Sequence, residues 1–132
     1  MLNRRILTAI FTICMVVGIT PLLHAQRWVL LGESHLDGQH DHDVIEVGRQ
    51  MGRLHELQVR VRFATIRFDR IVVHYGGGTS ETVHLRRVIR GGDQSRPIRL
   101  AGGERFVHSL ELWYSRAQRN SPKPEVRLWG AR

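Results

Sequence analysis

The chain is poor in two residue types on which many small proteins depend. Among its 132 residues, Cys14 is the only cysteine and Lys123 is the only lysine. A lone cysteine cannot form an internal disulfide, and we expect Cys14 to be removed with the N-terminal segment. The remaining chain would then have neither a disulfide nor a thiol nucleophile. The sequence therefore predicts a domain whose stability comes from packing alone.

The sequence also lacks the local motifs of several enzyme classes. No serine stands in a Gly-x-Ser-x-Gly elbow, the motif that places a nucleophile between a strand and a helix. The glycines at 76–78 precede a strand pattern, not a helix with a P-loop lysine. The 12 acidic residues show no pairing signal for glycoside hydrolysis. We expect a protein with no catalytic activity and no cofactor; the alternative is a hydrolase whose residues are remote from one another in sequence.

Only one long apolar run occurs, and it lies at the N-terminus. Positions 6–19 are mostly apolar and follow Arg4 and Arg5. This arrangement is typical of a secretory signal peptide, and the run is shorter than the roughly 20 residues of a membrane-spanning helix. We therefore expect a signal peptide over 1–25 and a periplasmic or secreted bacterial domain over 26–132, with no transmembrane segment after cleavage.

Basic residues outnumber acidic ones, 20 to 12, for a formal net charge of +8. All but one are arginines, whose planar guanidinium favours bidentate contacts with carboxylate and phosphate. We expect a basic face that binds anionic glycan or lipid headgroups of the cell envelope, or another envelope protein; nucleic acid is not expected, because no recognition helix or stacking motif occurs. The alternative is an ordinary solvated sheet face whose arginines pair with glutamates. The predicted face comprises Arg60, Arg62, Arg86, Arg87 and Arg90.

Apolar and polar residues alternate in segment after segment beyond Gln26, with turn residues between them. Such alternation is typical of strands that bury one face. The three glycines at 76–78 can supply the backbone angles of a hairpin turn, so we expect a hairpin over 67–85. Short strands at this spacing predict an all-β protein, a single antiparallel sandwich of jelly-roll type with seven or eight strands. The predicted core contains Leu57, Val59, Val61, Ile71, Val73, Leu110, Leu112, Val126 and Leu128.

Two tryptophans fall out of phase with the apolar face of their strands. Trp113 and Trp129 alternate with the predicted core residues and therefore point to the other face. Outward indoles can stack on a sugar ring or on an arginine. The alternative, which we favour at this point, is that both fill a second layer of the sandwich.

The stretch His40-Asp41-His42-Asp43 offers the strongest candidate for a metal site. If it is extended, the two histidines share one face and supply half of the ligands that zinc or copper needs. If it is a loop, its aspartates and Asp37 are suitable calcium ligands. The third interpretation is a turn that feeds a strand over 44–47, with Asp43 accepting hydrogen bonds from local backbone amides. We favour the turn and expect no stoichiometric metal.

Several segments resemble a known family. The segments "WVLLGE", "DHDVIEVGR", "VVHYGGG", "IRGGDQSRPIRL", "ERFVHSLELWY" and "VRLWG" together are similar to a family of small exported bacterial domains of unknown function. The resemblance spans about residues 27–130 and implies a secreted β-sandwich with no assigned activity. A looser similarity, at the level of fold, connects the chain to galactose-binding-like domains, and a shared fold does not imply a shared function.

Overall fold

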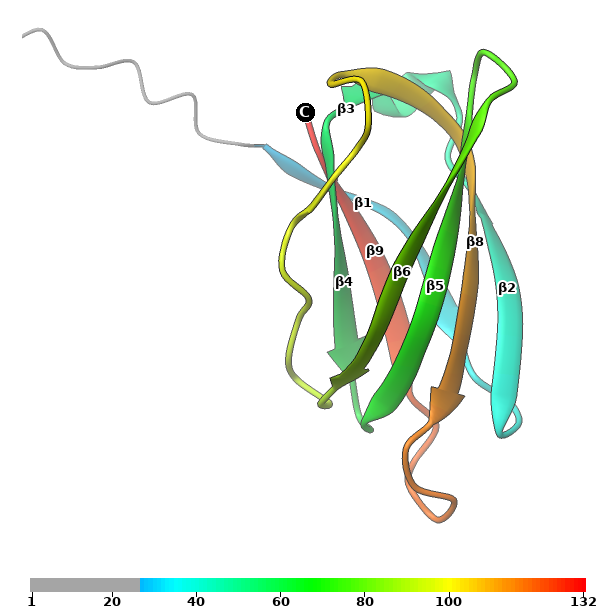
Figure 1. The fold of residues 1–132 in the computed structure, drawn as a ribbon. Helices are drawn as coiled ribbons and strands as arrows, with labels where there is room; N and C mark the ends of the chain where they lie inside the picture. The colour runs from blue at the N-terminus through cyan, green and yellow to red at the C-terminus, as the bar shows by residue number, and fades with distance from the viewer. Residues whose placement is uncertain (1–26) are drawn as a thin grey trace, which may run out of the picture.

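The computed structural model describes residues 27–132, which form two antiparallel β-sheets packed face to face (Figure 1). This confirms the all-β prediction. The predicted signal peptide lies outside the described residues. Within 27–132, no helix is long and apolar enough to cross a membrane.

The sheets draw their strands from distant parts of the chain. The first sheet has the order β1 (Trp28–His35), β9 (Glu125–Ala131), β4 (Glu56–Arg62) and β7 (Ile98–Arg99). The second has the order β2 (His40–Glu46), β8 (Arg105–Arg116), β5 (Ile66–Tyr75) and β6 (Ser80–Ile89), and β3 (Arg53–Leu54) pairs with β8. One short 3-10 helix, η1, covers Arg49–Met51. The described part of the chain has nine strands instead of seven or eight, because two of them, β3 and β7, are only two residues long.

The predicted hairpin is present as β5 and β6. Its turn contains three glycines, of which Gly78 adopts a φ of 92°, a left-handed conformation that glycine reaches without steric cost. The turn closes with a hydrogen bond from the Gly78 amide to the Tyr75 carbonyl at 3.0 Å. The two strands then run beside each other for most of their length.

The core lies between the two sheets and contains every residue that the alternation predicted. Leu57, Val59, Ile71 and Leu112 are among the side chains with no exposed surface. Within β5, Ile66, Phe68, Ile71, Val73 and Tyr75 face the core, and their spacing of two is interrupted only at the bulge between Phe68 and Arg70. The nine predicted core positions are therefore confirmed as buried.

The stretch His40 to Asp43 is part of a strand, so the prediction of a turn feeding a strand over 44–47 was wrong. Strand β2 begins at His40 and ends at Glu46, and it pairs along its whole length with β8. The hydrogen bonds to β8 hold these residues in a strand, and the local sequence of the segment does not reveal that partner. The predicted local bond is present: the Val44 amide donates to Asp43 Oδ1 at 2.8 Å.

Candidate functional site

The pairing of β5 with β6 is interrupted by a bulge on the outer face of the second sheet. Phe68 pairs with Arg87 and Arg70 pairs with His84, so two residues of β6 lie opposite a single residue of β5. One of the two is Arg86, whose φ is 45°. A residue other than glycine in this left-handed region is strained, and such residues cluster at functional sites. Bulges also redirect the side chains around them.

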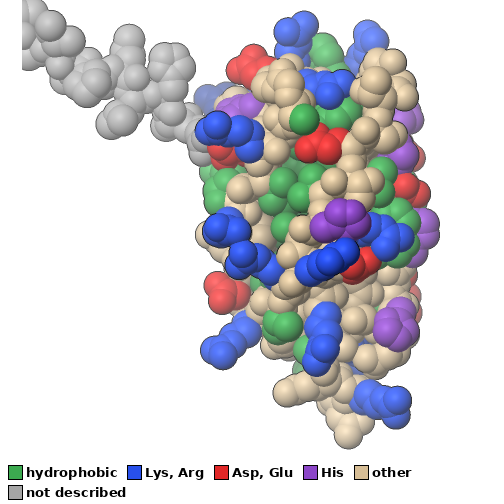
Figure 2. All heavy atoms as spheres, viewed as in Figure 1, with side chains coloured by type: hydrophobic (Ala, Val, Ile, Leu, Met, Phe, Trp, Pro, Cys, Tyr) green, Lys and Arg blue, Asp and Glu red, His purple; other side chains and the backbone are tan. Residues whose placement is uncertain are grey.

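A basic groove of about 450 Å³ lies at this bulge. Its lining includes three arginines, Arg67, Arg86 and Arg87, and two aspartates, Asp41 and Asp69, together with Val88 and Trp113. Within residues 27–132, none of these three arginines lies within ion-pair distance of a carboxylate. Figure 2 shows basic side chains spread over the visible face of the molecule, with histidines and acidic side chains among them. The groove has the volume of a small-molecule site, and three guanidiniums against two carboxylates leave its lining with a net positive charge.

Trp113 lies on the outer face and does not fill a second layer, so the arrangement that we favoured from the sequence was wrong. The imidazole of His42 stacks on the indole, with ring centroids 4.2 Å apart and planes 8° apart. The guanidinium carbon of Arg70 lies 4.1 Å from the indole centroid. His42 and Arg70 come from the strands on opposite sides of β8, so the indole is held between them and is not open for a sugar ring to stack on.

Trp129 has the corresponding place on the first sheet. It is half-buried, and the guanidinium of Arg60 lies 4.3 Å from its ring centroid. Both tryptophans therefore stack on arginine, which was the other arrangement considered from the sequence.

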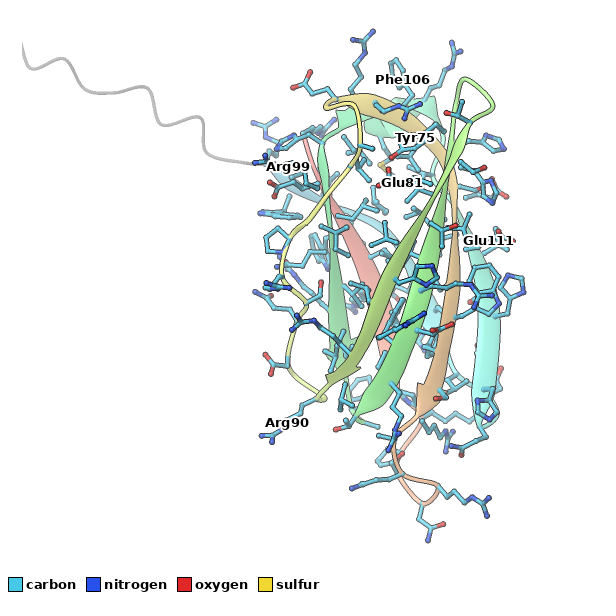
Figure 3. All side chains as sticks on the ribbon, viewed as in Figure 1. Tyr75, Glu81, Arg90, Arg99, Phe106 and Glu111 are labelled. Atoms are coloured by element: carbon cyan, nitrogen blue, oxygen red, sulfur yellow. The ribbon has the colours of Figure 1, made fainter. Side chains whose placement is uncertain are left out.

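The five predicted arginines do not form one surface, because they lie on different sheets. Arg60 and Arg62 belong to β4, whereas Arg86 and Arg87 belong to β6. Arg62 pairs with Glu125 at 3.4 Å. Arg90 follows the end of β6 and does not line the groove; Figure 3 shows it pointing away from the body of the protein.

The four residues of the predicted metal site alternate across β2. His40 and His42 are exposed, whereas Asp41 and Asp43 are half-buried on the opposite side. His40 and Asp41 line the basic groove. Burial raises the pKa of the neighbouring Tyr114 phenol, and the charges of Asp41 and Asp43 raise this pKa further.

Asp37, the further calcium candidate, lies 3.1 Å from the ammonium of Lys123. The structure therefore spreads the predicted ligands over a strand and a loop and does not gather them around one point.

A different cluster on the same outer face was missed from the sequence. Glu111 of β8 accepts contacts from two histidines: Oε2 lies 2.8 Å from Nε2 of His74, and Oε1 lies 3.3 Å from Nε2 of His42. The hydrogen bond from His74 is the main cause that lowers the pKa of Glu111 below its usual value. Figure 3 shows Glu111 beside β2 with side-chain rings around it. Nothing in the local sequence signals this cluster, because its members are more than 30 positions apart.

A polar cluster joins strand ends at the end of the sandwich that lies away from Arg90 (Figure 3). The Tyr75 hydroxyl donates to Glu81 Oε2 at 2.5 Å, and the same oxygen accepts the Ala101 amide at 3.1 Å. The guanidinium of Arg105 lies over the Tyr75 ring at 3.5 Å. Burial raises the pKa of Tyr75. Figure 3 shows Tyr75 and Glu81 facing each other here, in an arrangement that ties β5 and β6 to the start of β8.

Comparisons with other proteins place the chain in a family and assign no activity. No curated protein matches this chain. The family model described as Domain of unknown function (DUF2541) matches residues 7–130, a span that covers nearly the whole sequence. The chain belongs to this family of domains of unknown function.

Proposed function

We propose that this protein is an exported, non-catalytic binding module of the bacterial cell envelope that holds the anionic groups of a glycan in its basic groove. One observation carries the proposal: Arg67, Arg86 and Arg87 line a single groove without carboxylate partners among the described residues. An arginine without a partner has its full donor set available for a carboxylate or phosphate.

The backbone at the groove supports a functional role. Arg86 occupies a left-handed conformation that costs an L-residue about 1–2 kcal/mol. A glycine at this position would remove that cost. A bulge at a different place in the pairing of β5 with β6 would remove it as well. A positively charged side chain at a strained position in a concave site is better explained by ligand binding than by an ordinary solvated strand edge.

A glycan fits the groove better than a membrane surface. Four large apolar side chains are exposed in the described part of the chain, and only Val88 lines the groove. A surface that inserts into a bilayer needs several apolar residues side by side. The groove instead offers three guanidiniums, two carboxylates and a single exposed valine, and this mainly polar lining suits a sugar acid or a phosphorylated sugar.

An exported location rests on the sequence of the first 25 residues, where an apolar run follows Arg4 and Arg5. The surface glycans of the envelope carry carboxylates and phosphates, so this location would bring the groove to its ligand.

Binding of the purified mature protein to a polyuronate, with a neutral glucan as the control polymer, tests the proposal. The double variant Arg86→Gln with Arg87→Gln should bind the polyuronate about tenfold or more weakly, since a hydrogen bond to a charged group contributes about 1.5 kcal/mol or more. The matched control is Arg90→Gln with Arg99→Gln, which removes the same charge from positions outside the groove.

Binding should also weaken as the salt concentration rises. Equal losses in the two double variants would show that only net charge matters and would contradict the assignment to the groove. Equal binding to the neutral glucan, or binding only to another envelope protein, would contradict the ligand class.

A further inference from the structure

A second pocket, of about 360 Å³, lies at the end of the sandwich where β5 ends and β8 begins (Figure 3). We call it the end pocket, and it shares no lining residue with the basic groove. Its charged lining residues are three arginines, Arg49, Arg53 and Arg105, and one carboxylate, Glu104. The lining therefore carries a net positive charge.

The aromatic ring of Phe106 contacts two of these arginines. The guanidinium carbon of Arg53 lies 5.3 Å from the ring centroid, and that of Arg49 lies 5.8 Å from it. Arg53 is paired directly with Phe106 between β3 and β8, and Arg49 comes from η1. A guanidinium that lies over an aromatic ring uses its face for that contact. The N–H groups in its plane stay available to an anion.

These in-plane donors are unused within the described part of the chain. Among residues 27–132, the side chains of Arg49 and Arg53 neither pair with a carboxylate nor donate a hydrogen bond, and both are exposed. Arg105 differs, because it donates to Thr79 Oγ1 at 2.8 Å and lies over the ring of Tyr75. Two arginines of the pocket therefore keep their full set of donors for a ligand.

The glycine turn between β5 and β6 forms another part of the lining, and at Gly77 the fold itself does not require glycine. Gly78 has a positive φ, but Gly77 does not. A Cβ at Gly77 would meet no other group within 4 Å. The Gly77 amide has no hydrogen-bond partner among the described residues. A glycine at such a position lets a ligand approach the backbone closely.

We propose that the end pocket binds the phosphate group of a soluble phosphate monoester. The planar donor fork of arginine matches the geometry of phosphate oxygens. A phosphate monoester has three terminal oxygens, so it can accept from Arg49, Arg53 and the Gly77 amide together, whereas a carboxylate has only two. This site and its ligand are separate from the glycan in the basic groove, and the proposal does not rest on it.

A soluble ester fits the end pocket better than a phosphate headgroup within a bilayer. Proteins that lie in the membrane interface bury apolar side chains beside their basic ones. None of the large exposed apolar side chains in the described part of the chain lines this pocket; they are Leu30, Val44, Phe63 and Val88.

Titration of the isotope-labelled mature protein with glycerol 3-phosphate, followed by NMR, tests the site residue by residue. We expect saturable shifts of the Gly77 amide and of the side-chain Nε–H groups of Arg49 and Arg53. Glycerol, the uncharged control, should cause none of these shifts. Glycerate, which carries a carboxylate in place of the phosphate, should bind more weakly.

The double variant Arg49→Gln with Arg53→Gln should bind glycerol 3-phosphate about tenfold or more weakly, because it removes two charged donors. The matched control is Arg86→Gln with Arg87→Gln. It removes the same charge from the basic groove and should leave the shift at Gly77 unchanged.

Gly77→Ala separates a binding role from a structural one. The added methyl group meets no protein atom, and alanine restricts the unfolded chain, so the melting temperature should stay equal or rise. Binding of glycerol 3-phosphate should nevertheless weaken, because the methyl group enters the pocket. A glycine with only a structural role would not give this combination.

Three results would overturn the proposal. The first is the absence of saturable shifts with glycerol 3-phosphate; binding only to phosphatidylcholine vesicles that contain phosphatidic acid would then identify a lipid headgroup instead. The second is equal affinity in the wild type and the Arg49 and Arg53 double variant. The third is full binding by Gly77→Ala, which would place the anion away from the turn. None of these results bears on polyuronate binding, so the two proposals fail or survive separately.

Discussion

Arg86→Gly should make the folded protein more stable while it weakens binding to anionic polymer. The φ of 45° at Arg86 costs an L-residue about 1–2 kcal/mol, whereas glycine reaches it freely. Glycine in a strand loses about 0.5–1 kcal/mol more chain entropy on folding than alanine does. The arginine side chain is exposed, so little packing is lost. The net expectation is a gain of roughly 0.5–1 kcal/mol in the free energy of unfolding.

The neighbouring residue provides the control. Arg87 lies on the same strand and lines the same groove, but its φ is not positive. Arg87→Gly should therefore lower the free energy of unfolding by about 0.5–1 kcal/mol. Both variants remove one guanidinium from the groove, so both should weaken binding to the polyuronate. The two effects on stability have opposite signs although the two substitutions are chemically identical.

Urea denaturation followed by tryptophan fluorescence measures both effects on stability, provided that the slope with denaturant is unchanged. If Arg86→Gly is destabilised as much as Arg87→Gly, the bulge is not strained. If Arg86→Gly gains stability but binds the polyuronate as the wild type does, the strain serves some purpose other than ligand binding. Either result would remove the argument that connects the backbone of the groove to its function.

Three further predictions concern the core, the histidine cluster and the N-terminus. Leu112 is fully buried, so Leu112→Ala should lower the free energy of unfolding by about 2–5 kcal/mol; a loss well under 1 kcal/mol in denaturant would contradict its place in the core. The pKa of Glu111 lies below its usual 4.5 in the folded protein, so its carboxylate stabilises the fold above that pH and loses this effect as the pH falls through the lowered pKa. Glu111→Gln should accordingly cost stability at neutral pH and little at strongly acidic pH, and an equal cost at both would refute the assignment. N-terminal sequencing of protein from the envelope fraction should begin near Gln26, and an intact Met1 there would refute export.

The all-β fold and the identity of the core could be predicted from the sequence because both depend on local periodicity. In the strand Glu56–Arg62, Leu57, Val59 and Val61 alternate with polar residues, and successive side chains of any strand point to opposite faces. The hairpin of β5 and β6 was equally local, since its turn glycines lie between its two strands. These features need no knowledge of which strands are neighbours.

The strand boundaries and the surroundings of the tryptophan side chains could not be predicted from each segment alone, because both depend on neighbouring strands. His40 begins a strand because β8 lies beside it, and the start of β8 is 65 positions further along the chain. The alternation placed Trp113 on the second face of its strand. Whether that face met solvent or another layer depended on the number of sheets, and two sheets leave it outside, between His42 and Arg70.

The sequence by itself determined that the protein would be a basic β-sandwich. Alternation depends only on neighbouring residues, and net charge depends only on composition, so neither requires knowledge of which strands pair. Only the tertiary structure decided which arginines share a groove and which histidines share a carboxylate. The sequence does not distinguish Arg60 from Arg86, since both are arginines within strands, yet the strand order places them on different sheets. His42 and His74 meet at Glu111 because β8 lies between β2 and β5 in one particular register, and a shift of that register by one residue would turn Glu111 to the other face.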